Sequence, residues 1–405
     1  MTIEQAKPLV RQPVPRGIAT TGPAILSYGF RPFFLLAGSF AILAMSAWIG
    51  ALTLGWDIGG EFGPLNWHAH EMLFGYASAA LAGFMLTAIP NWTGRLPVSG
   101  LPLLGLVVVW TLGRLVMAFP DLIGGIPSMA IDACFLPLLA LIAGREIVAG
   151  KNWKNLKILA GLAALSAANI AFHVAVATTG SGLDASRFAV GIYVMLIALM
   201  GGRIVPSFTR NWLARTGSSV LPSPFGSFDI VAIAALLIAL LSWAIWPDGP
   251  VTAAAAFIAT GLQGARLWRW HGLRTYREPL LIVMHVAYAF IPLGMIMVGL
   301  AALGWVAPAS ALHVLTVGAI GTMTFAVMTR ASLGHTGRAL SASRRCTAAY
   351  VALALAALLR PLAEIVPGQY HALLSASAAC WLLAFGLFVL EYGPILTTAG
   401  MRKIR

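Results

Sequence analysis

Long runs of apolar residues dominate the chain, and short segments rich in charged residues, glycine and proline separate them. A transmembrane α-helix needs about 20 consecutive, mostly apolar residues to cross the hydrocarbon core of a bilayer. Runs of this kind occupy residues 31–55, 67–90, 101–119, 124–144, 156–179, 187–206, 228–246, 251–269, 280–304, 309–330, 346–366 and 371–396. The pattern therefore predicts an all-α integral membrane protein with about 12 transmembrane helices.

The composition excludes most classes of soluble protein. Of the 405 residues, 59% are hydrophobic and only 10% are charged, whereas soluble domains carry about 25% charged residues. A cytosolic enzyme, a disordered protein and a disulfide-rich secreted domain are excluded on this ground. Cys134, Cys346 and Cys380 lie far apart without a Cys-x-x-Cys motif, so neither a disulfide framework nor a zinc knuckle is expected.

The basic residues are distributed unevenly between the two ends of the predicted helices. A net charge of +13 is compatible with nucleic-acid binding, but the charges stand singly in short loops. We therefore expect the lipid bilayer, and no nucleic acid, as the partner. When successive loops are assigned to alternate sides, only Arg114, Arg187 and Arg360 of the 26 Lys and Arg residues fall outside one side. By the positive-inside rule, both termini are expected in the cytoplasm.

The expected domain organisation is simple. No signal peptide is apparent, so residues 1–30 are interpreted as a cytoplasmic tail, 31–396 as a single polytopic transmembrane domain and 397–405 as a short cytoplasmic tail. The second, sixth and tenth helices end in similar sequences, at Ile89–Arg95, Val205–Trp212 and, more loosely, Gly334–Arg338. This spacing suggests a three-fold pseudo-repeat of four-helix units.

Several of the eight histidines are expected at one depth in the membrane. A helix rises about 1.5 Å per residue, which puts one group near the outer face: His68, His70, His173, His313 and His371. His285 lies instead in the cytoplasmic third. Each imidazole alone could cap a helix or hydrogen-bond to a neighbour. As a group they favour heme or metal ligation, because imidazole is a common iron and copper ligand and intramembrane ionisable groups mark functional sites.

Helix geometry restricts which histidines can act together. His68 and His70 are two residues apart and therefore face opposite sides of a helix. Either they serve different partners, or an unwound helix start lets the His-x-His-Glu run fold around one ion. A bis-histidine heme needs ligands on two facing helices, which His70 and His313 supply. Without a Cys-x-x-Cys-His motif such a heme would be b-type and non-covalent. Glu71 either orients a ligand imidazole or reaches the outer interface.

Two charged residues are expected to pair inside the membrane. The third helix places Arg114 about 20 Å from the cytoplasmic edge, and the fourth places Asp132 about 18 Å from it. A tight connection makes these helices antiparallel neighbours. A lone charge at this depth costs about 3 kcal/mol even on a lenient scale. We therefore predict an Arg114–Asp132 ion pair that acts as scaffold; the alternative is that each charge finds water separately.

Longer motifs run through most of the chain in order. They are Tyr28–Phe34, Asn66–Tyr76 continuing to Pro90–Arg95, Arg203–Thr209, His285–Tyr288, and His313–Gly318 continuing to Gly334–Arg338. With these motifs the chain resembles the NnrS family. The resemblance implies a bacterial inner-membrane protein of twelve helices that contains heme and copper and is associated with denitrification and resistance to nitric oxide. The four-helix periodicity is also similar to that of heme-copper oxidases, but their histidine clusters are absent, so oxygen reduction is not expected.

The leading hypothesis is a heme- and copper-containing protein of the nitric oxide response, which binds or processes nitric oxide or a metal-nitrosyl species. The candidate heme site comprises His70 and His313 as axial ligands with Glu71 beside them; the metal candidates are His68, His173 and, as a separate site, His285. One alternative is a secondary transporter of a metal ion or small solute, whose histidines bind cargo at a broken helix. A third hypothesis is a structural assembly factor. Catalytic residues are not assigned.

Overall fold

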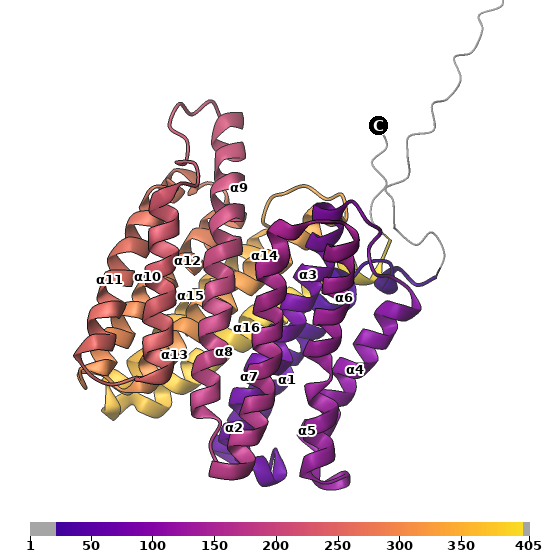
Figure 1. Ribbon diagram of the computed structural model, residues 1–405, viewed down its shortest axis with the longest axis vertical. Helices are drawn as coiled ribbons and strands as arrows, with labels where there is room; N and C mark the ends of the chain where they lie inside the picture. The colour runs from indigo at the N-terminus through magenta and orange to yellow at the C-terminus, as the bar shows by residue number, and fades with distance from the viewer. Residues whose placement is uncertain (1–21, 400–405) are drawn as a thin grey trace, which may run out of the picture.

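Residues 22–399 are described by the computed structural model, and this part of the chain contains helices but no strand (Figure 1). The long helices are α1 (Phe30–Leu54), α2–α3 (Gly63–His70 and Ser78–Thr93), α4 (Leu101–Ala118), α5–α6 (Gly125–Ala133 and Phe135–Ala149), α7 (Leu156–Thr179), α8–α9 (Leu183–Leu196 and Gly202–Arg215), α10 (Ser227–Ile245), α11 (Pro250–Trp268), α12 (Pro279–Ala302), α13–α14 (Pro308–His313 and Thr322–His335), α15 (Arg344–Ile365) and α16 (Tyr370–Thr397). Eleven of these twelve are long and apolar enough to cross a membrane. The predicted fold class, an all-helical membrane protein, is confirmed.

The remaining long helix, α11, is less apolar than the other eleven because it carries Gln263 and Arg266. Both side chains are buried, so the helix hides its polar groups in the bundle and does not expose them to lipid.

Two helices continue beyond their predicted ends. The sixth runs to Arg215, nine residues past its expected end at 206, and includes Pro206 within the helix. The tenth runs to His335 and not to 330. His335 is therefore the last residue of a helix. Proline is tolerated inside membrane helices because neighbouring groups satisfy the freed carbonyl.

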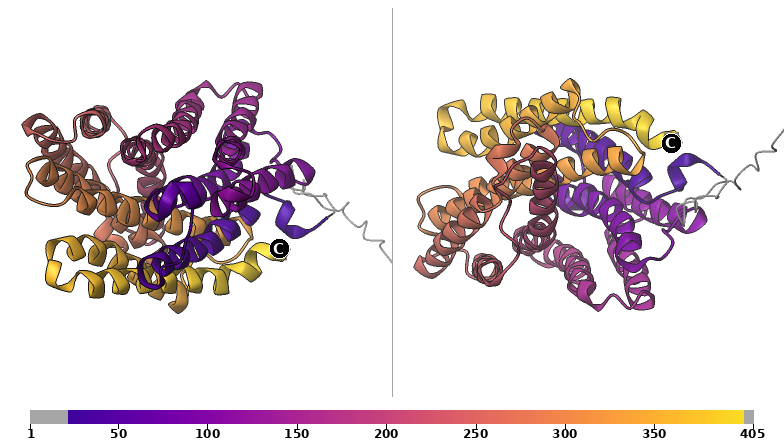
Figure 2. Two further views of the ribbon diagram at one scale, coloured as in Figure 1. Left: turned by 90° about the horizontal axis from the view of Figure 1, so that it is seen from below. Right: turned by 90° about the horizontal axis from the view of Figure 1, so that it is seen from above.

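The first and last helices meet at the same end of the bundle. The Arg31 guanidinium donates hydrogen bonds to the carbonyls of Leu396, at 2.9 Å, and Thr398, at 2.6 Å. Figure 2 shows α1 lying against α16. Helix α16 also packs against α15. The chain therefore crosses the bundle an even number of times, as the charge pattern indicates. The outer parts of both predicted tails, residues 1–21 and 400–405, lie outside the described residues.

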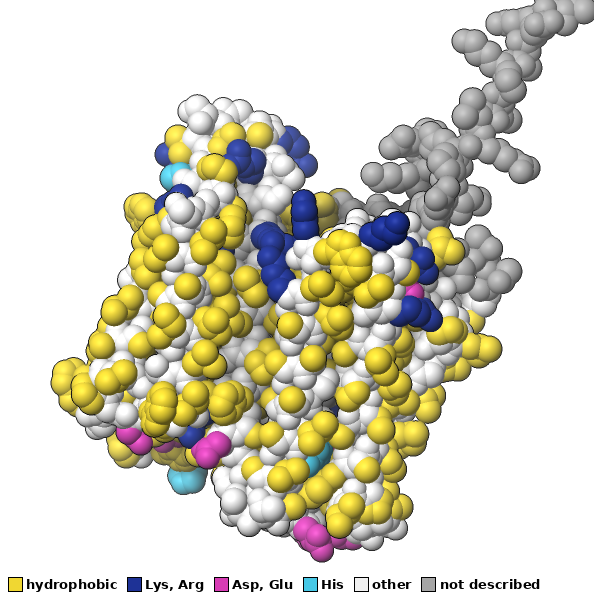
Figure 3. Space-filling view, viewed as in Figure 1, with side chains coloured by type: hydrophobic (Ala, Val, Ile, Leu, Met, Phe, Trp, Pro, Cys, Tyr) yellow, Lys and Arg dark blue, Asp and Glu magenta, His cyan; other side chains and the backbone are white. Residues whose placement is uncertain are grey.

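Lys and Arg side chains gather at this same end, while Asp and Glu side chains appear at the opposite end (Figure 3). We call the first end the basic face. The positive-inside rule predicts that the basic face is cytoplasmic.

Each of the three helices that share the terminal sequence motif contains a π-helical segment. The segments are Glu71–Ala77 between α2 and α3, Ile197–Gly201 between α8 and α9, and Val314–Gly321 between α13 and α14. They recur every four long helices, which supports the pseudo-repeat. A π turn leaves carbonyl groups without their usual partners, and such segments are frequent at functional sites. Here Trp110 donates to the Gly75 carbonyl and Arg266 to the Ala198 carbonyl.

Candidate metal centre

His70 occupies the last position before the first π segment and is fully buried. Its Nδ1 atom donates to Glu71 Oε1 at 2.8 Å. Its Nε2 atom lies 3.0 Å from Asn169 Oδ1 and 3.0 Å from Asp132 Oδ2. Phe74 and Phe172 pack around the ring. The imidazole is thus held in one orientation, with Nε2 directed towards α5 and α7.

Asp132 joins two histidines from different helices. Its Oδ2 atom lies 2.8 Å from His173 Nε2 on α7, in addition to His70 Nε2 on α2. The rings of His70 and His173 have their centroids 4.8 Å apart. Asn169, one turn before His173, donates its amide to the same carboxylate oxygen at 3.0 Å. Two imidazoles and one carboxylate therefore converge at a buried point.

Arg114 binds both acidic groups of this cluster. Its Nη1 atom lies 2.8 Å from both Glu71 oxygens, and its Nη2 atom donates to Asp132 Oδ1. The predicted Arg114–Asp132 ion pair is thus present. The pair does more than join two helices, because the Asp132 carboxylate also contacts His70 and His173.

The hydrogen-bond pattern around His70 requires a positive charge. A neutral imidazole has one N–H group, yet both ring nitrogens of His70 face acceptors, Glu71 at Nδ1 and Asp132 at Nε2. In addition, two carboxylates face a single guanidinium. A metal ion bound at Nε2, or one more proton on the ring or on a carboxyl group, supplies the missing charge and relieves the repulsion between lone pairs.

The spacing of the donor atoms suits one ion. The ligand atoms of His70, Asp132 and His173 all lie within 4.8 Å of one another. Ligands at about 2.0–2.2 Å from a tetrahedral ion lie about 3.4 Å from each other, so small side-chain movements would complete the site. Two imidazoles and a carboxylate suit zinc, copper or iron. In the described part of the chain, this is the one group of three such side chains close enough to share an ion.

His68 faces away from this cluster, as the spacing of two residues predicts. Its ring stacks on Trp48, with centroids 4.5 Å apart, and its Nδ1 atom is buried without a hydrogen-bond partner. His68 belongs to the regular helix α2, so the idea that an unwound helix start folds around one ion is wrong.

His313 occupies the position before the third π segment that His70 occupies before the first. Its Nδ1 atom donates to the Ala309 carbonyl at 2.7 Å, which leaves Nε2 as the atom with a lone pair. No hydrogen bond or ring contact joins His313 to His70 within the described residues. The structure thus brings His70 together with Glu71 and His173, while His68 and His313 both lie outside that group.

His285 lies apart from both groups, on α12 near the basic face. Its Nε2 atom is 2.8 Å from Thr209 Oγ1, and its Nδ1 atom is buried without a partner. The sequence likewise predicts His285 apart from the outer histidines. No other candidate ligand contacts it in the described part of the chain.

Asn169 and Asp132 are the site residues that the sequence analysis did not place with the histidines. Asp132 was recognised as an intramembrane charge but was paired with Arg114 alone. Asn169 carried one usable signal: it precedes His173 by four residues and so shares its helix face.

The chain was also compared with known proteins. The family model described as NnrS protein matches residues 24–399. No curated protein gives a match. The match covers nearly all of the chain and includes every residue of the candidate metal centre, so this multi-pass membrane protein belongs to the NnrS family.

Proposed function

We propose that the protein is a heme- and copper-containing protein of the bacterial inner membrane that binds nitric oxide in the response to nitrosative stress during denitrification. The observation that carries the proposal is the buried convergence of His70, Asp132 and His173. We assign copper to this group and b-type heme to the pair His68 and His313.

The residues of the metal centre suit a bound cation in three respects. Their donor atoms are close together and are buried away from water. The two carboxylates of Glu71 and Asp132 face only one guanidinium, that of Arg114, so a bound cation would balance the remaining negative charge. Glu71 acts behind His70: by accepting the Nδ1 proton it fixes the tautomer in which Nε2 is the ligand atom. Arg114 holds both carboxylates in place.

The residues assigned to heme offer ligand nitrogens on two separate helices. His68 has a buried nitrogen without a partner, and the Nδ1 hydrogen bond of His313 leaves its Nε2 atom with the lone pair that ligation needs. The sequence favours His70 as one heme ligand, but its contacts with Asp132 and His173 favour the copper assignment.

Nitric oxide is small and uncharged, so it reaches a site inside the bilayer without the desolvation cost that an ionic substrate would meet. Copper or heme iron, when bound, supplies a coordination position for such a ligand. The protein residues hold the metal, exclude water and fix the imidazole orientations.

The test is the metal content and visible spectrum of the detergent-purified protein. We expect copper to be lost in His173→Ala and Asp132→Asn, and the Soret band to be lost or shifted in His68→Ala and His313→Ala. His371→Ala, an exposed histidine at the same end, serves as the control and keeps both. Copper and heme retained in all four variants would refute the assignment.

The alternative of a metal transporter is tested with the same preparations. A resident cofactor stays bound through purification at a fixed stoichiometry, whereas cargo exchanges when radioactive metal is added to vesicles containing the protein. Transport of copper across the vesicle membrane that depends on Asp132 would replace our proposal.

A further inference from the structure

A large cavity opens at the basic face, and none of the residues that line it belongs to the metal centre. Its volume is about 700 Å³. It is lined by the ends of the three helices that contain π segments: α3 contributes Thr87, Asn91 and Trp92, α9 contributes Arg203 and Phe208, and α14 contributes Arg330 and His335. The three repeated terminal motifs therefore meet around one space, and none of these residues has a role in the function proposed above.

The charged residues that line this cavity are all basic. Lys154, Arg203 and Arg330 contribute to its wall, and its lining contains no Asp or Glu. None of the three makes a salt bridge within the described residues. Arg330 is held in place by stacking on Phe208, with its guanidinium 4.1 Å from the ring centroid. Basic residues anywhere at this end would satisfy the positive-inside rule, but three directed into one cavity repel one another and attract an anion.

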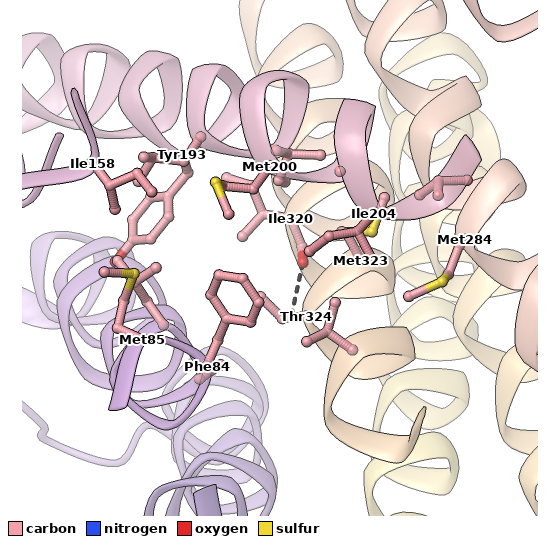
Figure 4. A pocket seen from close by; sticks show the side chains of 17 residues that line it. Phe84, Met85, Ile158, Tyr193, Met200, Ile204, Met284, Ile320, Met323 and Thr324 are labelled. Atoms are coloured by element: carbon pink, nitrogen blue, oxygen red, sulfur yellow. Dashed lines mark hydrogen bonds between the residues drawn. The ribbon is translucent and has the colours of Figure 1, made fainter. Parts of the chain in front are cut away.

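The inner end of the cavity is apolar. A smaller pocket of about 80 Å³ adjoins it and shares Phe84, Met200, Ile204, Met284 and Val327 with it. Figure 4 shows Met200 and Met323 from opposite helices directed towards this space, with Phe84 below them. Methionine side chains are flexible and polarisable, and they adapt to apolar ligands of irregular shape.

We propose that this cavity binds an amphiphilic anion, with a phosphate or carboxylate head at Lys154, Arg203 and Arg330 and an apolar body along the methionine-lined pocket. Basic pockets between transmembrane helices at the cytoplasmic side recognise acidic lipid head groups by the same charge complementarity. A soluble organic anion with an apolar body has the same chemistry. Asn91 and Asn155 also line the cavity. Each amide donates one N–H group within the protein, to Thr87 O and to Asn152 Oδ1, and keeps a second N–H group for the head.

The experiment measures binding to the purified full-length protein in a neutral maltoside detergent by titration calorimetry. The probes are phosphatidylglycerol, phosphatidylcholine with the same acyl chains, decanoate and inorganic phosphate. We expect one phosphatidylglycerol or decanoate molecule per chain, with phosphatidylcholine and inorganic phosphate weaker by roughly tenfold or more, because each lacks either the net negative charge or the apolar body. Binding of phosphatidylglycerol alone identifies a bilayer lipid as the source, and binding of decanoate alone identifies a soluble anion.

The matched variants are Arg203→Gln/Arg330→Gln for the cavity and Arg274→Gln/Arg345→Gln for exposed arginines outside its lining. We expect the first to weaken binding by roughly tenfold or more and the second to leave it unchanged. Arg203→Lys/Arg330→Lys keeps the charge and should restore most of the affinity. If the glutamine pair fails to fold, Lys154→Gln, at an exposed position, replaces it. Equal binding of phosphatidylcholine and phosphatidylglycerol, or wild-type affinity in the cavity variants, overturns the proposal.

Discussion

His70 and His173 approach the same carboxylate oxygen, Oδ2 of Asp132, at 3.0 and 2.8 Å. The two histidines are 103 positions apart in the chain and belong to α2 and α7, so the site exists only when the second and fifth long helices pack against the fourth. The metal centre therefore depends on how these three helices pack together.

Glu71→Gln should weaken metal binding without abolishing it. The amide no longer offers a charged acceptor to the Nδ1 proton of His70, so the ligand nitrogen becomes less basic and less well oriented. Loss of such an outer partner typically costs about 10–100-fold in metal affinity. Competition of the metal-free protein with a chelator measures the change. Glu61→Gln, at an exposed position ten residues before Glu71, is the control. Equal metal affinities in the two variants would contradict the role of Glu71.

Removing one member of the Arg114–Asp132 pair should destabilise the protein strongly. Arg114→Leu leaves two buried carboxylates without their cation, and Asp132→Leu leaves part of the guanidinium unpaired. Breaking a buried pair costs about 3–5 kcal/mol. We expect a lower yield of folded protein and a lower Tm for each.

The Arg114→Leu/Asp132→Leu double variant should recover only part of that loss, since Glu71 then remains unpaired. Adding Glu71→Gln should recover more, because no buried charge is left without a partner. Strictly additive losses across this series would show that the three side chains do not act together.

Arg266 and Asp229 form a second buried pair, with Arg266 Nε 2.8 Å from Asp229 Oδ1. Asp229→Asn should lower the free energy of unfolding by about 3 kcal/mol, since the guanidinium loses its only carboxylate partner within the described residues. The control is Asp184→Asn, whose pair with Arg187 is exposed at the carboxylate and worth about 1 kcal/mol or less. Thermal unfolding in detergent compares the two, and similar shifts in Tm would be inconsistent with a structural role for Asp229.

Two glycines leave the space that the buried arginines occupy. A Cβ atom at Gly75 would lie 2.6 Å from Arg114 Nη1, and one at Gly202 would overlap the Arg266 guanidinium. Gly75→Ala and Gly202→Ala should therefore destabilise the protein by about 1–3 kcal/mol through overpacking. Gly264→Ala, in α11 with open space around it, should be neutral or stabilising by up to about 1 kcal/mol. The comparison is made from the Tm of each variant; a Gly202→Ala variant as stable as Gly264→Ala would show that the guanidinium moves freely.

Acidification should release the metal. Imidazole and carboxylate must be deprotonated to bind an ion, so protons compete with it as the pH falls. We expect the metal content after dialysis to decrease between about pH 7 and pH 5, where histidine ordinarily titrates, and to recover when copper is restored at neutral pH. Metal retained unchanged at pH 5 would argue against histidine ligands.

The sequence by itself determined the number of long helices, their ends to within a few residues for most of them, and which loops lie at the same end of the bundle. These follow from a local property, because the bilayer requires about 20 apolar residues for each crossing whatever the neighbours of a helix are. It also determined the Arg114–Asp132 pair, since two costly charges at one depth on helices joined by a short connection have few other partners.

Only the tertiary structure decided which histidines meet. Helix periodicity and rise give the depth of a side chain and its direction relative to its own helix, and on that basis His70 could pair with His313. They do not give the rotation of each helix or its neighbours in the membrane plane. The arrangement of α2, α5 and α7 placed His70 beside Asp132 and His173 and left His313 outside this group. The same packing brought Arg203 and Arg330 into one cavity, because side chains distant in sequence share a site only when their helices turn the right faces to each other.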